Sequence, residues 1–127
     1  MENKYVNYGD VDPLECSRYV RRKSENEFEV FYGEKTFDVD KEGNPLYYCA
    51  FLTVNPNDSW IEKESVGEVF GCDYDDCSPE EQVVMLVDYY PIDNFSPNCI
   101  GTRSKPFVSE SKLMEIYEKE IKPNLEV

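Results

Sequence analysis

Three aspartates, Asp73, Asp75 and Asp76, stand between Cys72 and Cys77, and this short segment has the densest group of side chains suited to chemistry. Carboxylate oxygens are preferred ligands of Ca²⁺, but an EF-hand loop also requires a glycine at its sixth position and a glutamate at its twelfth. Counted from the first aspartate, the sequence has serine and valine at these positions. We therefore interpret the segment as a solvated loop between two helices, with a looser Mg²⁺ or Ca²⁺ site as the alternative.

The two cysteines of this loop are separated by four residues, a spacing that could begin a zinc site completed by Cys16, Cys49 or Cys99. A structural zinc site normally takes its ligands from two closely spaced pairs, and the chain has one. The cysteine count is odd, and no secretory signal precedes the cysteines, so a disulfide framework is not expected. We predict reduced thiols, most of them buried, and no cofactor.

The chain contains no histidine, which removes the Ser-His and Cys-His catalytic pairs and every metal site that needs imidazole. Its twenty-seven acidic residues make any single pair of carboxylates uninformative as a catalytic signature. No glycine-rich phosphate loop, nucleophile elbow or HExxH pattern is present. The sequence therefore favours a non-enzymatic protein, and a ligand-binding or enzymatic domain with a carboxylate- or cysteine-based site remains the alternative.

The net charge of −14 is concentrated in one stretch, because residues 58–93 hold eleven acidic residues and a single base, Lys63. Such a chain repels nucleic acids and anionic membranes, whose binding requires clustered Lys and Arg. It attracts basic surfaces instead. We therefore hypothesise a protein-binding inhibitor that neutralises a basic nucleic-acid-binding protein, such as a nuclease, in the manner of a DNA mimic, an anti-defence protein or an immunity protein.

Acidic side chains of this stretch are the candidate contacts with that partner: Glu64, Glu68, Asp73, Asp75, Asp76, Glu80 and Glu81. Long-range attraction would speed the encounter, and aromatic contacts would then hold the complex. Two alternatives stay open. The acids could serve only as a solubility coat, or the chain could be a structural or regulatory subunit of a larger assembly.

Positive charge gathers at one place, the cluster Arg18, Arg21, Arg22 and Lys23. We expect these side chains to pair with the glutamates that follow or to lie along a strand edge, with an anion-binding role as the alternative. The glutamates in question are Glu25, Glu27 and Glu29.

The first half of the chain favours β-structure. Residues 28–32 predict a strand that ends at Gly33, and residues 46–54 are apolar on both alternating faces, which is typical of a central strand covered on two sides. The polar segment 40–45 predicts the turn between them. Residues 18–23 fit either a strand or the end of a short helix.

The second half favours helices. Ser59 and Glu62 have the spacing of a capping box and predict a helix over about 60–70, with Val66, Val69 and Phe70 on one face. A second box at residues 78–81, with proline at the first helical position, predicts a central helix that ends before Pro91. A last amphipathic helix is predicted over about 110–122. The fold class that follows is α+β: an N-terminal antiparallel β-hairpin or meander packed against about three C-terminal helices.

We expect one domain over residues 1–127, in the cytoplasm, because no apolar run has the length of a membrane span and the first residues are too polar for a signal peptide. Residues 57–66, together with residues 88–90 and 94–95, resemble small acidic proteins found on mobile elements of Firmicutes, over about half of the chain. That group has no assigned activity to carry over. The resemblance implies a role in conflict between mobile elements and their hosts.

Overall fold

The computed structural model describes residues 4–95, 98–99 and 107–126. Its centre is an antiparallel sheet in the order β1-β2-β3-β4-β5, and β6 also pairs with β4. The strands are β1 (Val6–Asn7), β2 (Cys16–Arg22), β3 (Phe28–Val39), β4 (Pro45–Val54), β5 (Asn98–Cys99) and β6 (Phe107–Ser109).

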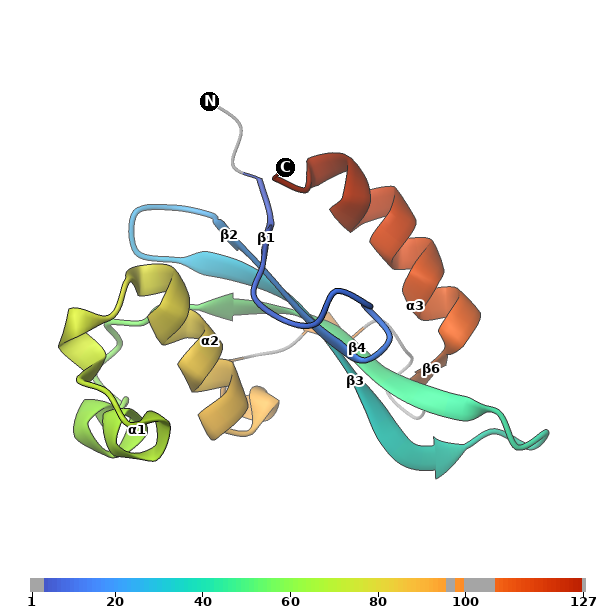
Figure 1. Ribbon diagram of the computed structural model, residues 1–127, viewed down its shortest axis with the longest axis horizontal. Helices are drawn as coiled ribbons and strands as arrows, with labels where there is room; N and C mark the ends of the chain where they lie inside the picture. Colours follow the sequence, from blue (N-terminus) through green and yellow to red (C-terminus); the bar gives the residue numbers. More distant parts are fainter. Residues whose placement is uncertain (1–3, 96–97, 100–106, 127) are drawn as a thin grey trace.

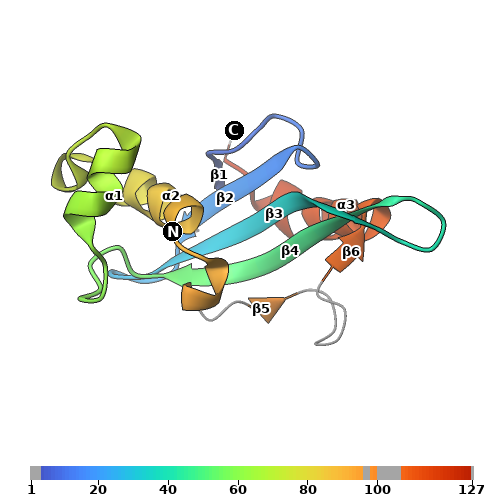
Figure 2. The ribbon, with the colours of Figure 1, turned by 90° about the horizontal axis from the view of Figure 1, so that it is seen from below.

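Helices cover both faces of this sheet, as Figures 1 and 2 show. One face is covered by the segments between β4 and β5, which are α1 (Lys63–Phe70), η1 (Tyr74–Asp76), α2 (Pro79–Tyr89) and η2 (Ile92–Phe95). The other face is covered by α3 (Glu110–Ile116), which continues as a π-helical turn η3 (Tyr117–Ile121) and a 3-10 turn η4 (Lys122–Asn124). Among the described residues, no helix has the length and apolar character needed to cross a bilayer.

Strand β4 requires cover on both faces of the sheet, because its side chains are apolar on both faces. Ala50 and Leu52 are buried under α2, and Tyr47 and Cys49 are buried under α3. The prediction of a central strand covered on two sides is therefore confirmed. The α+β class is confirmed as well.

The predicted arrangement of the strands is partly wrong. The sheet is not wholly N-terminal, because β5 and β6 follow the first two helices in the chain and pair with the outer side of β4. The predicted end of the strand at Gly33 is also wrong, since β3 runs on to Val39. Gly33 permits close packing here: a Cβ atom at this position would lie 3.0 Å from the Cβ of Ser17 and 3.3 Å from a methyl of Leu113.

The predicted turn after β3 is confirmed. The Oδ1 atom of Asp40 accepts hydrogen bonds from the backbone N–H groups of Asn44 and Glu42, both at 2.9 Å. These donors hold the pKa of Asp40 below its usual value. The hairpin projects beyond the rest of the sheet (Figure 1), because β2 pairs with β3 only as far as Glu34, and Phe37 near its tip is fully exposed.

The capping box at Ser78 and Glu81 is present with both of its hydrogen bonds, and Pro79 opens α2 as predicted. The box predicted at Ser59 and Glu62 is wrong, because α1 begins only at Lys63 and no side chain caps it. The undecided segment 18–23 lies mostly in β2.

Candidate partner-binding surface

Helix α1 and the loop after it are held together by two glycines. Gly71 ends α1 in the left-handed conformation, with φ of 69°. The chain then folds back, and the backbone N–H of Cys72 donates to the carbonyl of Gly67 at 2.9 Å. A Cβ atom on Gly67 would lie 2.6 Å from the carbonyl oxygen of Cys72, so only glycine permits this approach. The loop that holds the aspartates is thereby fixed against α1.

Tyr74 anchors the same loop in the core. Its ring is buried, and its hydroxyl donates to the carbonyl of Pro56 at 2.6 Å. Its own carbonyl accepts from the side-chain amide of Gln82 in α2, at 2.7 Å. Burial, together with the nearby charge of Asp75, raises the pKa of the Tyr74 hydroxyl. Because Tyr74 points inward, the aspartates on either side of it are left at the surface.

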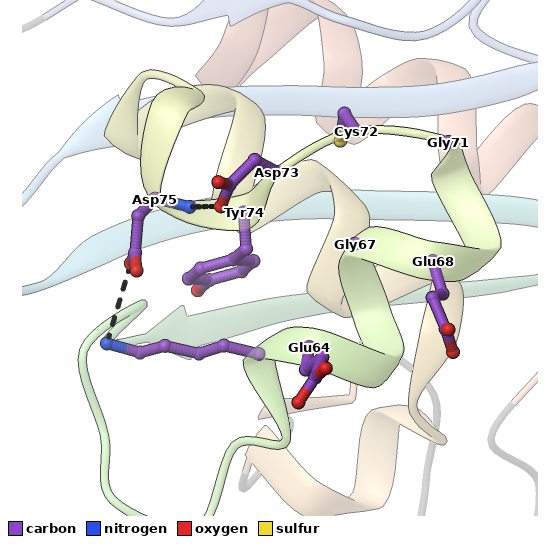
Figure 3. A pocket seen from close by; sticks show the side chains of 9 residues that line it. Glu64, Gly67, Glu68, Gly71, Cys72, Asp73, Tyr74 and Asp75 are labelled. Atoms are coloured by element: carbon purple, nitrogen blue, oxygen red, sulfur yellow. Dashed lines mark hydrogen bonds and ion pairs between the residues drawn. The ribbon is translucent and has the colours of Figure 1, made fainter.

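An open hollow of about 720 Å³ lies between α1 and this loop (Figure 3). Four of the seven predicted contact residues line it: Glu64, Glu68, Asp73 and Asp75. Among the described residues that line the hollow, Lys63 is the single base, and its ammonium lies 4.0 Å from the carboxylate of Asp75. The residues that line the hollow thus carry four carboxylates and one ammonium, so the hollow is strongly negative.

The remaining three predicted contacts lie outside the hollow. Asp76 is exposed on η1 and follows Asp75, which lines the hollow. Glu80 lies 3.8 Å from the guanidinium of Arg22, and Glu81 belongs to the capping box of α2. The structure therefore divides the predicted set into acids that stabilise the fold and acids that do not. Glu80 and Glu81 belong to the first kind.

Three of the acids have no such role. Among the contacts of the described residues, no ion pair or side-chain hydrogen bond involves the carboxylate of Glu64, Glu68 or Asp76. All three are exposed. We call them the unpaired acids. Two of them lie on α1, one turn apart, at the edge of the hollow.

Helix α1 carries exposed apolar side chains as well as two of the unpaired acids, and this exposure was not predicted from the sequence. Val69 and Phe70 in the last turn of α1 are 64% and 41% exposed, whereas Val66 is fully buried. Of the three residues on the predicted apolar face of this helix, Val66 alone is buried. Helix α1 has only eight residues and enters the core through Val66 and Gly67, so its last turn faces solvent.

The cysteine thiols of the loop lie close together. The Sγ atoms of Cys72 and Cys77 are 3.5 Å apart, while Cys16 and Cys49 lie on β2 and β4. The hydrogen bond to Cys72, partial burial and the charge of Glu81 raise the pKa of Cys77 to about 11. No group of three His, Cys, Asp or Glu side chains suited to a metal occurs among the described residues, and the side chain of Cys99 lies outside them.

The basic cluster is built into the fold. Arg18 is buried, and its Nε donates to a carboxylate oxygen of Asp88 in α2 at 2.9 Å. Arg21 pairs with Glu29 at 3.0 Å, as predicted. Arg22 donates to the backbone carbonyl of Glu25 rather than to its carboxylate. The most buried of the four predicted bases thus pairs with Asp88 of α2 rather than with the glutamates that follow it.

Compared with known proteins, the chain matches no family model, no curated protein and no solved structure. The surface around α1 and η1 therefore remains the guide to its function.

Proposed function

We propose that this protein is a non-enzymatic binding module that inhibits a basic nucleic-acid-binding protein through the surface around α1 and η1. The observation that carries the proposal is the hollow between α1 and its following loop, whose lining carries four carboxylates and one ammonium. A cationic side chain of a partner, Lys or Arg, fits the charge of this hollow. Its contacts would include the predicted set of acids, with the unpaired acids contributing most.

The division among the acids supports this proposal. An acid that already accepts hydrogen bonds from a cap, or already pairs with an arginine, loses those interactions when it turns to a partner. Glu64, Glu68 and Asp76 lose none, because the described residues give them no such interaction. Exposed rim charges of this kind act mainly on the rate of association and on its salt dependence.

The apolar neighbours argue against a coat that serves solubility alone. Exposed Val69 and Phe70 lower solubility, and they lie on the same helix as Glu64 and Glu68. Protein interfaces combine an aromatic and apolar centre with a charged rim. The last turn of α1 therefore provides contact area, and the acids around it provide steering.

The proposal is tested by capture at low salt. The immobilised protein is incubated with a nuclease-treated lysate of its source cells, and retained proteins are quantified by mass spectrometry over a salt gradient. We expect retention of a basic nucleic-acid-binding protein that elutes as salt rises, because screening shortens the range of the attraction. Added duplex DNA should compete with the retention, since both ligands would use the same basic site.

Two variants of equal charge make the test specific. The surface variant combines Glu64→Gln, Glu68→Gln and Asp76→Asn, and the control variant combines Glu25→Gln, Glu118→Gln and Glu126→Gln, all at exposed positions. Each removes three negative charges. The surface variant should release the partner at a lower salt concentration, and the control should behave as the wild type. Equal loss in both variants would reduce the effect to net charge and refute the assigned surface.

A cysteine-based catalytic site has less support. A nucleophilic cysteine needs a lowered pKa, so that thiolate is present at neutral pH. The pKa of Cys77 is raised instead, to about 11, by the hydrogen bond with Cys72, partial burial and neighbouring carboxylates. Its thiol is protonated at neutral pH.

A further inference from the structure

Two sulfur atoms lie next to the thiol of Cys72, beside the acidic hollow. The Sγ of Cys72 lies 3.5 Å from the Sγ of Cys77 and 3.6 Å from the Sδ of Met85. The three residues come from the loop after α1, the turn before α2 and the middle of α2. Partner binding at the acidic hollow would require neither the thiol pair nor the thioether.

The two separations from the thiol of Cys72 are close to those around a single bound ion. Metal–sulfur bonds of about 2.3 Å in a flat three-coordinate site place the sulfur atoms about 4 Å apart. The two observed separations are therefore a few tenths of an ångström shorter than the bound geometry requires. Cys72 and Cys77 lie on a loop between two helices, where such a shift needs no movement of the sheet.

The kind of donor selects the ion. Two thiolates and a thioether form a soft ligand set, which favours Cu(I). A structural Zn²⁺ site takes four donors, and the described residues offer no group of three His, Cys, Asp or Glu side chains at one place. Ca²⁺ and Mg²⁺ take oxygen ligands and would not use the sulfurs.

We propose that Cys72, Cys77 and Met85 bind one Cu(I) ion. The two thiols lose their protons to solvent as the ion binds, and the thioether donates without any change of protonation, so no electron is transferred. Cys72 is exposed and lines the hollow, which makes it the entry ligand. Met85 is only 8% exposed and closes the inner side.

The negative surroundings favour a cation at this site. Asp73 and Asp75 line the same hollow as Cys72, and their carboxylates attract a cation. Metal binding to thiols releases their protons, so the site takes up the ion in exchange for protons.

The test is an anaerobic competition with the full-length reduced protein. Cu(I) is supplied as its acetonitrile complex, and bathocuproine disulfonate serves as the coloured competitor. We expect one Cu(I) per chain. The Cys72→Ser and Cys77→Ser variants should lose this binding, and Met85→Leu should weaken it by about tenfold or more, as a lost ligand does. Cys16→Ser, a cysteine on β2 remote from the cluster, should bind as the wild type does.

X-ray absorption identifies the ligands directly. The wild type should show three sulfur neighbours at about 2.3 Å, and Met85→Leu should show two. Far-UV circular dichroism of each variant checks that it is folded. Three results would overturn the proposal: copper binding that survives the loss of both loop cysteines, an unchanged sulfur count in Met85→Leu, or a Cys72–Cys77 disulfide formed under these conditions with all copper left on the competitor.

Discussion

Replacing Arg18 by leucine tests the one cation that is buried in the described structure. Its side chain is only 5% exposed and crosses from β2 to α2. Its Nη1 donates to the carbonyls of Ser17 and Gly33, at 2.8 and 3.0 Å, and its Nε donates to Asp88. The guanidinium lies 3.9 Å from the centre of the Tyr32 ring. Leucine fills most of this volume but makes none of the hydrogen bonds.

The magnitude follows from which of these partners water can reach. The carboxylates of Asp88 and Glu34 are 37% and 54% exposed, so water replaces the arginine there and the two ion pairs contribute little. The carbonyl of Gly33 is buried, and a hydrogen bond from a charged donor contributes about 1.5–3 kcal/mol. Adding the lost cation–π contact, we expect a loss of about 3 kcal/mol in the free energy of unfolding.

Urea unfolding followed by circular dichroism measures this loss, and Arg21→Leu is the matched control. Arg21 lies on the same strand and also pairs with a glutamate and a tyrosine ring, but its side chain is 32% exposed. The control should lose about 1 kcal/mol or less. If Arg18→Leu loses no more than the control, the buried hydrogen bonds from Arg18 to the carbonyls of Ser17 and Gly33 do not stabilise the fold, and the reasoning is refuted.

Three further outcomes are expected. The surface variant that neutralises the unpaired acids should raise the melting temperature by roughly 2–4 °C in low salt, by relief of repulsion, and high salt should remove the difference. Burial raises the pKa of Tyr19 and Tyr32, so the unfolded chain ionises first and stability should fall as the pH rises above about 10, measured by urea titration at several pH values. Gly67→Ala should cost about 1–3 kcal/mol through the clash with the carbonyl of Cys72, whereas Gly71→Ala, where a Cβ meets nothing, costs only its backbone strain of about 1 kcal/mol.

The elements that could be predicted from the sequence are those whose cause is local. The apolar alternation of residues 46–54 and the capping box at Ser78 each require only neighbouring residues, and both are present. Ser59 and Glu62 have the same residue types at the same spacing, but no capping box forms there. The carbonyl of Asp58 accepts from the N–H of Ile61, whose side chain is buried in the core, and this turn delays the helix until Lys63. Tertiary burial there overrides a local signal.

The features that escaped prediction depend on residues far apart in the chain. Gly33 has the sequence context of a turn, but it is needed for close packing against Ser17 and Leu113, which lie 16 residues before and 80 residues after it. Met85 reaches the thiol of Cys72 only because α2 folds back beside the loop. The concentration of acids between residues 58 and 93 was visible in the sequence, but its division into paired and unpaired carboxylates was not.

The division into paired and unpaired acids distinguishes a proposed recognition surface from a solubility coat. A solubility coat requires only net charge, and the positions of the acids do not matter to it. Here many acids serve the fold, as Asp40 does in its turn and Glu29 does with Arg21. The unpaired acids serve no such purpose among the described residues, and two of them lie on the same helix as exposed Phe70. Folding gains nothing from this arrangement, and solubility is reduced by its apolar part. The proposed basic partner would cover both the charge and the ring, which would account for both costs.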